Sequence, residues 1–180
     1  MAYMHAPFFT PAMMAVGPVR KSLQFKTIFN LLGPLVNPCR PQNQLLGTAD
    51  LTQMRLYTNV YQTLDINYGV VNSLDGYDEI SLTGDFKVAT NSTEKIYTPE
   101  SYNFKRVQMN EIFGGQTAEE AKAIFDNVLM DKATEAQKNV VIANAGFAIH
   151  IINQQKSVED CMAEARESIE SGRALATLKK

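Results

Sequence analysis

The chain has 180 residues, which is the length of one domain of ordinary size, and 45% of them are hydrophobic, enough for a buried core. Seventeen Lys and Arg residues against 19 Asp and Glu residues give a formal net charge of -2 at pH 7. Proteins dedicated to nucleic-acid binding usually carry a basic excess, so this balance argues against a nucleic-acid partner. We therefore expect residues 1–180 to form a single domain.

Two cysteines and two histidines offer little material for a metal site built on these residue types. Cys39 and Cys161 lie far apart in the sequence and form no CxxC pair, so we interpret both as reduced structural thiols. The N-terminus lacks the basic and apolar regions of a secretory signal, and the longest apolar stretch, 140–152, is too short for a membrane span. We expect a cytoplasmic protein without a membrane partner.

The first quarter of the chain predicts short helices interrupted by glycine and proline. Its predicted elements are a helix over 12–23 that starts after Thr10 and Pro11, a helix over 27–32 and a short strand over 44–47. A break is expected at Gly17 and Pro18, because proline disrupts a helix interior. Gly33 and Pro34 follow the second helix in the order that is usual at a helix end.

The rest of the chain alternates predicted strands and helices. Its predicted elements are a helix from Asp50 to about 64, strands over 68–73, 80–83, 87–90 and 95–98, and helices over 118–130, 134–153 and 157–175. Each of the four helices begins at a Ser, Thr or Asp followed three residues later by Gln, Glu or Asp, which is the pattern of a capping box. The helix over 134–153 is apolar nearly all round, which indicates burial. Within it we interpret His150 as a satisfied core or interface histidine rather than a catalytic one.

This alternation predicts the α/β class, with a mostly parallel sheet flanked by helices. The strands between 80 and 98 follow one another closely, so antiparallel pairing is expected at that edge.

The densest acidic cluster is formed by Asp75, Asp78 and Glu79, directly after the predicted strand over 68–73. Ligands of open α/β sheets bind beyond the carboxyl ends of the strands. Neighbouring carboxylates there are hard oxygen ligands suited to Mg²⁺ carried with a phosphorylated substrate. The alternative from spacing alone is a solvated turn in which Gly76 supplies an unusual backbone conformation.

Three further features allow two interpretations each. The basic residues Arg20, Lys21 and Lys26 suit either a carboxylate-binding arginine or a solvated basic face. Gly33 and Pro34 either end a helix or shape a pocket, and the pair at 114–115 either forms a simple turn or binds an anion at a helix N-terminus. No two of the 10 glycines are separated by a single residue, which excludes the dinucleotide-binding fingerprint.

Five stretches of the sequence closely resemble the anthranilate phosphoribosyltransferase family, in the family's order and spacing. They are VRKSLQFKTIFNLLGPLVNPCRPQNQLLG (19–47), DGYDEIS (75–81), NEIFGGQTAEEA (110–121), NAG (144–146) and IESGRALATL (169–178). The resemblance implies a catalytic domain of the nucleoside phosphorylase and phosphoribosyltransferase type. It also implies transfer of a phosphoribosyl group from phosphoribosyl pyrophosphate to the amino group of anthranilate, in tryptophan biosynthesis.

The same resemblance assigns roles to individual residues. Arg20 would hold the carboxylate of anthranilate, and Gly33 and Pro34 would line the anthranilate site. Asp78 and Glu79 would bind the Mg²⁺ that accompanies the pyrophosphate. Positioning and electrostatics would then supply most of the rate, so no residue is expected to act as a covalent catalyst.

Full-length members of this family are nearly twice as long, and they begin with a helical domain and a glycine-rich pyrophosphate loop that this sequence lacks. The chain resembles the C-terminal half of such an enzyme, and we expect it not to complete turnover alone. The usual dimer forms through the helical domain, so any homo-oligomer of this chain would need another interface. The alternatives are a pyrimidine nucleoside phosphorylase-like enzyme and a non-catalytic binding module of the same fold.

Overall fold

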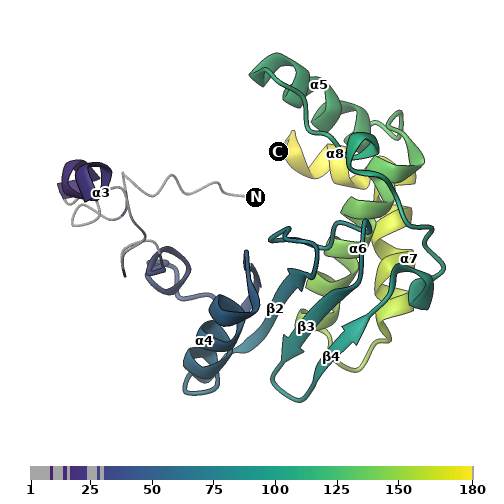
Figure 1. Ribbon diagram of the computed structural model, residues 1–180. Helices are drawn as coiled ribbons and strands as arrows, with labels where there is room; N and C mark the ends of the chain where they lie inside the picture. The colour runs from purple at the N-terminus through teal and green to yellow at the C-terminus, as the bar shows by residue number, and fades with distance from the viewer. Residues whose placement is uncertain (1–8, 10–13, 16, 24–27, 29–30, 180) are drawn as a thin grey trace. The chain divides into compact units, whose positions relative to one another are not determined.

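The computed structural model describes residues 9, 14–15, 17–23, 28 and 31–179 (Figure 1). The chain divides into two compact units, Met1–Gln42 and Asn43–Lys180. The described part of the first unit contains short helical segments, and the second unit contains the sheet and the helices around it. That all 180 residues form one domain stays a prediction.

The first unit contains the helix α3, Gly17–Leu23, and the 3-10 helix η2, Gly33–Leu35. Pro18 is the second residue of α3, and a proline in the first turn of a helix costs no hydrogen bond. Residues 14–15 are helical as well, and the residue between them and Gly17 lies outside the described ones, so the break expected at Gly17 and Pro18 stays a prediction. Gly33 and Pro34 were expected to end a helix, and they instead begin η2. The start predicted at Thr10 and Pro11, and most of the helix predicted over 27–32, fall outside the described residues.

The second unit is built on a four-stranded sheet with the strand order β1-β2-β3-β4. The strands are β1 Asn43–Gly47, β2 Asn67–Ser73, β3 Phe86–Thr90 and β4 Glu94–Tyr97. Among these strands the expected parallel pairing is limited to β1 and β2, while β2 with β3 and β3 with β4 pair antiparallel. The connection between β3 and β4 is too short for the crossover that a parallel pair requires. The α/β class with flanking helices is confirmed, and the sheet is mixed.

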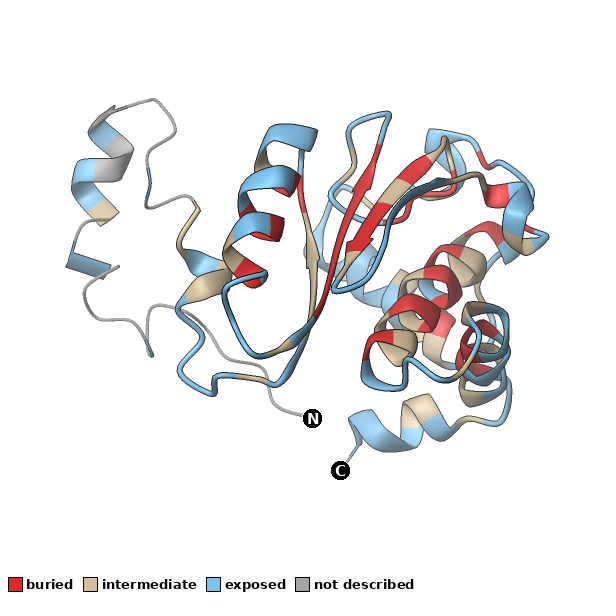
Figure 2. Ribbon diagram, turned by 90° about the horizontal axis from the view of Figure 1, so that it is seen from below, coloured by how far each residue is buried: buried red, intermediate tan, exposed pale blue. Residues whose placement is uncertain are grey.

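Helices lie on both faces of β2. On one face α4, Leu51–Tyr61, provides the crossover from β1 to β2, and the rings of Tyr61 and Tyr68 lie 5.4 Å apart. On the other face α6, Glu135–Ile152, packs on β1 and β2, with Ile151 lying against Gly69. Buried residues concentrate along β2, β3 and α6 (Figure 2).

The predicted helix starts are confirmed by their caps. The remaining helical elements are η3 Pro99–Tyr102, η4 Met109–Glu111, α5 Ala118–Leu129, α7 Val158–Glu170 and α8 Arg173–Leu178. The side chains of Asp50, Thr117, Thr134 and Ser157 each accept a hydrogen bond from the backbone N–H three residues later. The last predicted helix is divided at Gly172, whose φ of 75° is left-handed. None of the described helices is long and apolar enough to cross a membrane.

The strand predicted over 80–83 was wrong. Ile80, Ser81 and Leu82 are fully buried, as expected for an apolar strand, but they pair with no strand of the sheet. Leu82 adopts a left-handed φ of 60°, which breaks the extended conformation. Its carbonyl accepts from Val107 N–H at 3.1 Å, in the segment that leads to η4. This buried segment leads from the carboxyl end of β2 to β3.

The helices α6 and α7 pack closely at Gly146. A Cβ at this position would lie 2.4 Å from the Cγ and 3.1 Å from the Cα of Met162. Met162 is itself buried, at 6% exposure, so its side chain has no free space into which it could move away from a larger residue at position 146.

We predict that Gly146→Val destabilises the protein by about 1–3 kcal/mol, because the added side chain overpacks this contact. Urea unfolding followed by circular dichroism measures the change. Gly114→Val is the control, since a Cβ at Gly114 meets no atom within 4 Å. Equal stability of the two variants would show that α6 and α7 are not in close contact at Gly146.

Candidate functional site

Asp78 and Glu79 lie beyond the carboxyl end of β2, in the segment that joins β2 to β3. A turn immediately after Ser73 brings them there, closed by the hydrogen bond of 3.0 Å from Gly76 N–H to the Ser73 carbonyl. Gly76 has a φ of 102°, a conformation that side chains rarely adopt. The turn at Gly76 and the exposed carboxylates therefore occur together: the turn places Asp78 and Glu79 beyond the end of β2.

Both carboxylates are exposed, and the described residues place no hydrogen-bond or ion-pair partner on either of them. The protein around Glu79 still removes water from its carboxyl group, which raises the pKa above the ordinary value of 4.5. The neighbouring Asp78 carboxylate raises the pKa further by repulsion. A cation between the two groups would relieve this repulsion.

Three different elements hold the backbone of this segment. The Asp78 carbonyl oxygen lies so close to Gly47, the last residue of β1, that a Cβ there would be 1.5 Å from it. The Ser73 hydroxyl at the end of β2 donates to the Glu79 carbonyl at 2.6 Å. Asn144 on α6 hydrogen bonds to both the N–H and the carbonyl of Ile80. Three consecutive peptides are thus fixed by two strands and a helix.

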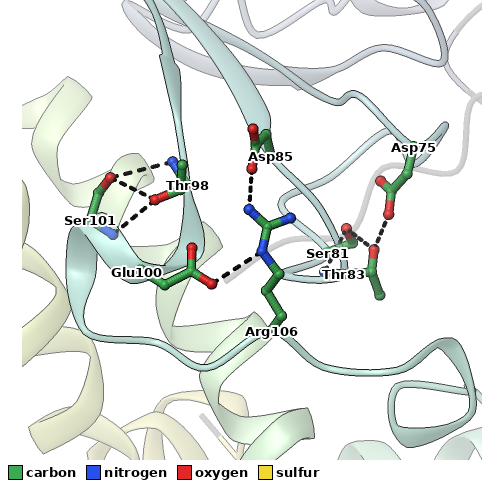
Figure 3. A network of polar contacts seen from close by, with 8 residues as sticks. All are labelled: Asp75, Ser81, Thr83, Asp85, Thr98, Glu100, Ser101 and Arg106. Carbon is green, nitrogen blue, oxygen red and sulfur yellow. Dashed lines mark hydrogen bonds and ion pairs between the residues drawn. The ribbon is translucent and has the colours of Figure 1, made fainter.

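Asp75 plays a different part from the other two acids of the cluster. Its carboxylate accepts a hydrogen bond from the Thr83 hydroxyl, which also lies 2.7 Å from the hydroxyl of Ser81 (Figure 3). The Ser81 N–H in turn donates to the Ser73 hydroxyl oxygen at 3.1 Å. Asp75 thus links the turn before the buried residues 80–82 to Thr83, the residue after them. Because its carboxylate is used in this internal contact, we do not group Asp75 with Asp78 and Glu79.

Arg106 anchors the far end of the same segment to η3. It donates to the Asp85 carboxylate, and its Nε donates to Glu100 at 3.1 Å (Figure 3). All three side chains are largely exposed, so this network contributes orientation more than stability. Sequence reasoning missed Arg106, because Asp85 lies 21 residues away, Glu100 lies six residues away, and no motif marks either partner.

A cavity of about 410 Å³ lies beside the acidic segment. It is lined by Tyr77, Met109, Asn110, Ile112, Phe113 and Gly114. Tyr77, which directly precedes Asp78 in the chain, is the lining residue that connects this largely apolar cavity to the acidic segment.

The other predicted features have structural explanations. His150 Nδ1 lies 2.8 Å from the Lys156 carbonyl, in agreement with a histidine satisfied within the fold. Neither Cys39 nor Cys161 forms a disulfide with a described residue, and burial raises the pKa of the Cys161 thiol.

The helix start after Gly115 is occupied by the protein's own side chains. The Glu120 carboxylate accepts from Gln116 N–H at 2.7 Å, and the Thr117 hydroxyl accepts from Glu120 N–H at 3.2 Å. An anion would have to displace Glu120, so the structure favours the simple turn that the glycine pair also allowed.

The remaining predicted site residues lie in the first unit. Arg20 belongs to α3, and Gly33 and Pro34 begin η2, whereas Asp78 and Glu79 belong to the second unit. That these five residues form one site stays a prediction. Among the described residues, no group of three or more His, Cys, Asp or Glu side chains is arranged to hold a metal ion. A cation here would therefore need ligands beyond the two carboxylates.

We predict that Glu79→Gln stabilises the protein at neutral pH. A carboxyl group whose pKa is raised by folding contributes stability that is complete below its unfolded pKa and is lost as the pH rises through its folded pKa. The melting temperature of Glu79→Gln should therefore exceed that of the unsubstituted protein by a margin that grows from about pH 4 to about pH 7.

Thermal unfolding of both proteins across this pH range, without divalent cations, measures the margin. Asp78→Asn provides the comparison, because it removes the repulsion and leaves the Glu79 carboxyl in place. A margin that does not change with pH would contradict the raised pKa.

Comparison with known proteins places this geometry in a family context. Among curated proteins, the chain is 62% identical over 180 residues to the anthranilate phosphoribosyltransferase of Phocaeicola vulgatus, covering 100% of this chain and 54% of that protein. It is 49% identical over 177 residues to that of Cytophaga hutchinsonii, covering 98% and 54%. The chain thus spans about half the length of the curated relatives that it matches.

Solved structures show the same fold. Anthranilate phosphoribosyltransferase from Thermus thermophilus matches with a TM-score of 0.86 at 30% identity, over 94% of this chain and 51% of that one. The enzyme from Saccharomyces cerevisiae in complex with 4-fluoroanthranilate matches with a TM-score of 0.90 at 23% identity, over 99% and 53%. Its complex with PRPP and Mg matches with a TM-score of 0.88 at 24% identity, over 97% and 50%.

The family model described as "Glycosyl transferase family, a/b domain" matches residues 1–175. Because this match takes in both units, including α3, β1, β2 and the segment with Asp78 and Glu79, the chain belongs to the glycosyl transferase family that carries this a/b domain.

Proposed function

We propose that the chain supplies the C-terminal half of an anthranilate phosphoribosyltransferase. The proposed reaction transfers a phosphoribosyl group from phosphoribosyl pyrophosphate to the amino group of anthranilate, in tryptophan biosynthesis. The observation that carries the proposal is the 62% identity to a protein of that name along the whole chain. The carboxylates of Asp78 and Glu79 at the carboxyl end of β2, which are exposed and have no partner among the described residues, agree with it.

The donors at this edge of the sheet suit Mg²⁺. Mg²⁺ prefers hard oxygen ligands and is commonly bound through one or two carboxylates together with substrate phosphates. Asp78 and Glu79 supply two such groups, both exposed, and their mutual repulsion favours a bound cation. When bound, Mg²⁺ would neutralise charge on the departing pyrophosphate. A yeast enzyme of the same fold has been solved in complex with PRPP and Mg.

For the acceptor we propose a site in the first unit. Arg20 would hold the anthranilate carboxylate as a charged hydrogen-bond donor, with Gly33 and Pro34 lining the site. A yeast enzyme of the same fold has been solved in complex with 4-fluoroanthranilate. The amine is itself the nucleophile, so the residues bind and orient the reactants, and a covalent catalytic residue is not required.

We further propose that the chain works in the cytoplasm without a nucleic-acid or membrane partner. Its net charge of -2 argues against nucleic acid.

The direct test is loss of anthranilate fluorescence in the presence of phosphoribosyl pyrophosphate and Mg²⁺. The assay is run on the chain alone and on the chain mixed with the separately produced N-terminal part of the Phocaeicola vulgatus relative. We expect turnover in the mixture, dependent on Mg²⁺, and little or none with either part alone. A folded mixture that does not consume anthranilate but phosphorolyses uridine or thymidine would favour the nucleoside phosphorylase alternative.

In the same mixture we predict that Arg20→Ala weakens the use of anthranilate. Loss of a hydrogen bond to a charged group costs about 1.5–3 kcal/mol, which should appear in kcat/KM for anthranilate. The KM for phosphoribosyl pyrophosphate should change much less. Lys21→Ala is the matched control, since it removes the same charge one position along α3. Unchanged kinetic constants for anthranilate in Arg20→Ala would contradict the role given to Arg20.

A further inference from the structure

We propose that Asn144 is a positioning residue for the carboxylate pair of Asp78 and Glu79. Its side-chain amide fixes the peptide groups of Ile80, the residue that follows Glu79, and so sets the direction in which the two carboxylates point. This inference rests on the proposed function, in which the two carboxylates bind a divalent cation.

The contact between Asn144 and Ile80 uses both polar atoms of one backbone residue. Asn144 Oδ1 accepts from Ile80 N–H at 3.0 Å, and Asn144 Nδ2 donates to the Ile80 carbonyl at 2.9 Å. Nδ2 also donates to the Val140 carbonyl one turn earlier in α6, at 2.9 Å, which orients the amide on its own helix. A carboxamide combines a donor and an acceptor in one plane, so shorter, charged or apolar side chains do not reproduce this pair.

Ile80 needs these hydrogen bonds because it is fully buried and lies outside the sheet. A buried backbone N–H or carbonyl without a partner is costly, and in this segment Asn144 takes the place of a neighbouring strand. Without Asn144 the segment would lose its attachment to α6 directly beside Glu79.

The other two attachments explain why the effect reaches the carboxylates. Gly47 limits the position of the Asp78 carbonyl, and the Ser73 hydroxyl holds that of Glu79 at 2.6 Å. These attachments belong to strands on one side of the segment, and Asn144 is the attachment from α6. Removing Asn144 leaves the two peptide groups on either side of Ile80 with hydrogen bonds on the Ser73 side alone, through the Glu79 carbonyl and the Ser81 N–H. Each peptide group is then held by one hydrogen bond where it was held by two, which loosens the backbone directly beside Glu79.

A general loss of structure is not expected when Asn144 is replaced. The helix α6 is held to the rest of the protein by buried apolar side chains, including Ala143, Phe147 and Ile151. Alanine is the best helix former, so Asn144→Ala keeps α6 intact and removes only the amide.

The experiment compares Asn144→Ala with the unsubstituted chain and with Asn139→Ala. Asn139 lies on the same helix, but its side chain accepts from Arg166 Nη2 at 2.8 Å and serves a different contact. Amide hydrogen exchange measured by NMR reports the attachment of the segment. Electron paramagnetic resonance of added Mn²⁺ reports the affinity of the carboxylates, with no substrate and no need for turnover.

We expect exchange of the Ile80 amide to accelerate about tenfold or more in Asn144→Ala, the equivalent of one lost hydrogen bond. Protection of β2 and α6 should be retained. The dissociation constant for Mn²⁺ should rise several-fold, whereas Asn139→Ala should match the unsubstituted chain in both measurements. If Asn144→Ala does not fold, Asn144→Leu replaces it, since leucine has nearly the same size and lacks both the Oδ1 acceptor and the Nδ2 donor.

Two results overturn the inference alone. Unchanged exchange at Ile80 would show that Asn144 does not hold the segment, and accelerated exchange with unchanged Mn²⁺ affinity would show that holding it does not position the carboxylates. Absence of Mn²⁺ binding to the unsubstituted chain would instead contradict the metal role in the proposed function, and the inference would fall with it.

Discussion

Residues 79–82 run through buried space between β2 and α6 without joining the sheet, so their backbone groups depend on other parts of the fold for hydrogen bonds. Ser73 and Asn144 supply most of these bonds from their side chains. Each is contributed by an element that belongs to the core, so the segment moves only if the core moves. The exposed carboxylates of Asp78 and Glu79 are therefore followed directly by fully buried residues, Ile80 to Leu82.

This arrangement separates the groups that hold the segment from the groups that face solvent. Asp75 is used internally, through the Thr83 hydroxyl, although it lies in the same acidic stretch as Asp78 and Glu79. The exposed pair lacks a cationic partner among the described residues, and partial burial of the Glu79 carboxyl, followed by repulsion from Asp78, raises the pKa of Glu79. The backbone next to Asp78 and Glu79 is held by hydrogen bonds, while the two carboxylates have no cationic partner among the described residues. Such an arrangement suits the binding of a cation together with a phosphorylated substrate.

Local signals in the sequence predicted the helices and β2 well. The caps formed by Asp50, Thr117, Thr134 and Ser157 each involve residues only three positions apart, so no distant contact is needed to recognise them. The prediction of a strand over 80–83 was wrong because the contacts of these residues are with distant parts of the chain. Its apolar residues are buried as predicted, but they are satisfied by partners that the local pattern does not contain.

The same reason explains which parts of the candidate site could be predicted. Asp78 and Glu79 stood out because carboxylates after a buried strand have a recognised chemical meaning. Asn144 is 64 residues from Ile80, and its place in the NAG stretch did not indicate what its amide contacts. Gly47 likewise gave no local sign that the Asp78 carbonyl lies against it. Only the packing of β1, β2 and α6 around one segment brings these residues together.

The most direct test of this account is to locate a bound cation on the unsubstituted chain. Mn²⁺ broadens the NMR signals of amides close to it, and a small amount added to the isotopically labelled chain will report its site. The account predicts that the amides of residues 77–81 broaden first, before those of the acidic helix α7. Broadening that begins at α7, or that spreads evenly over the acidic surface, would contradict the claim that Asp78 and Glu79 form a prepared cation site.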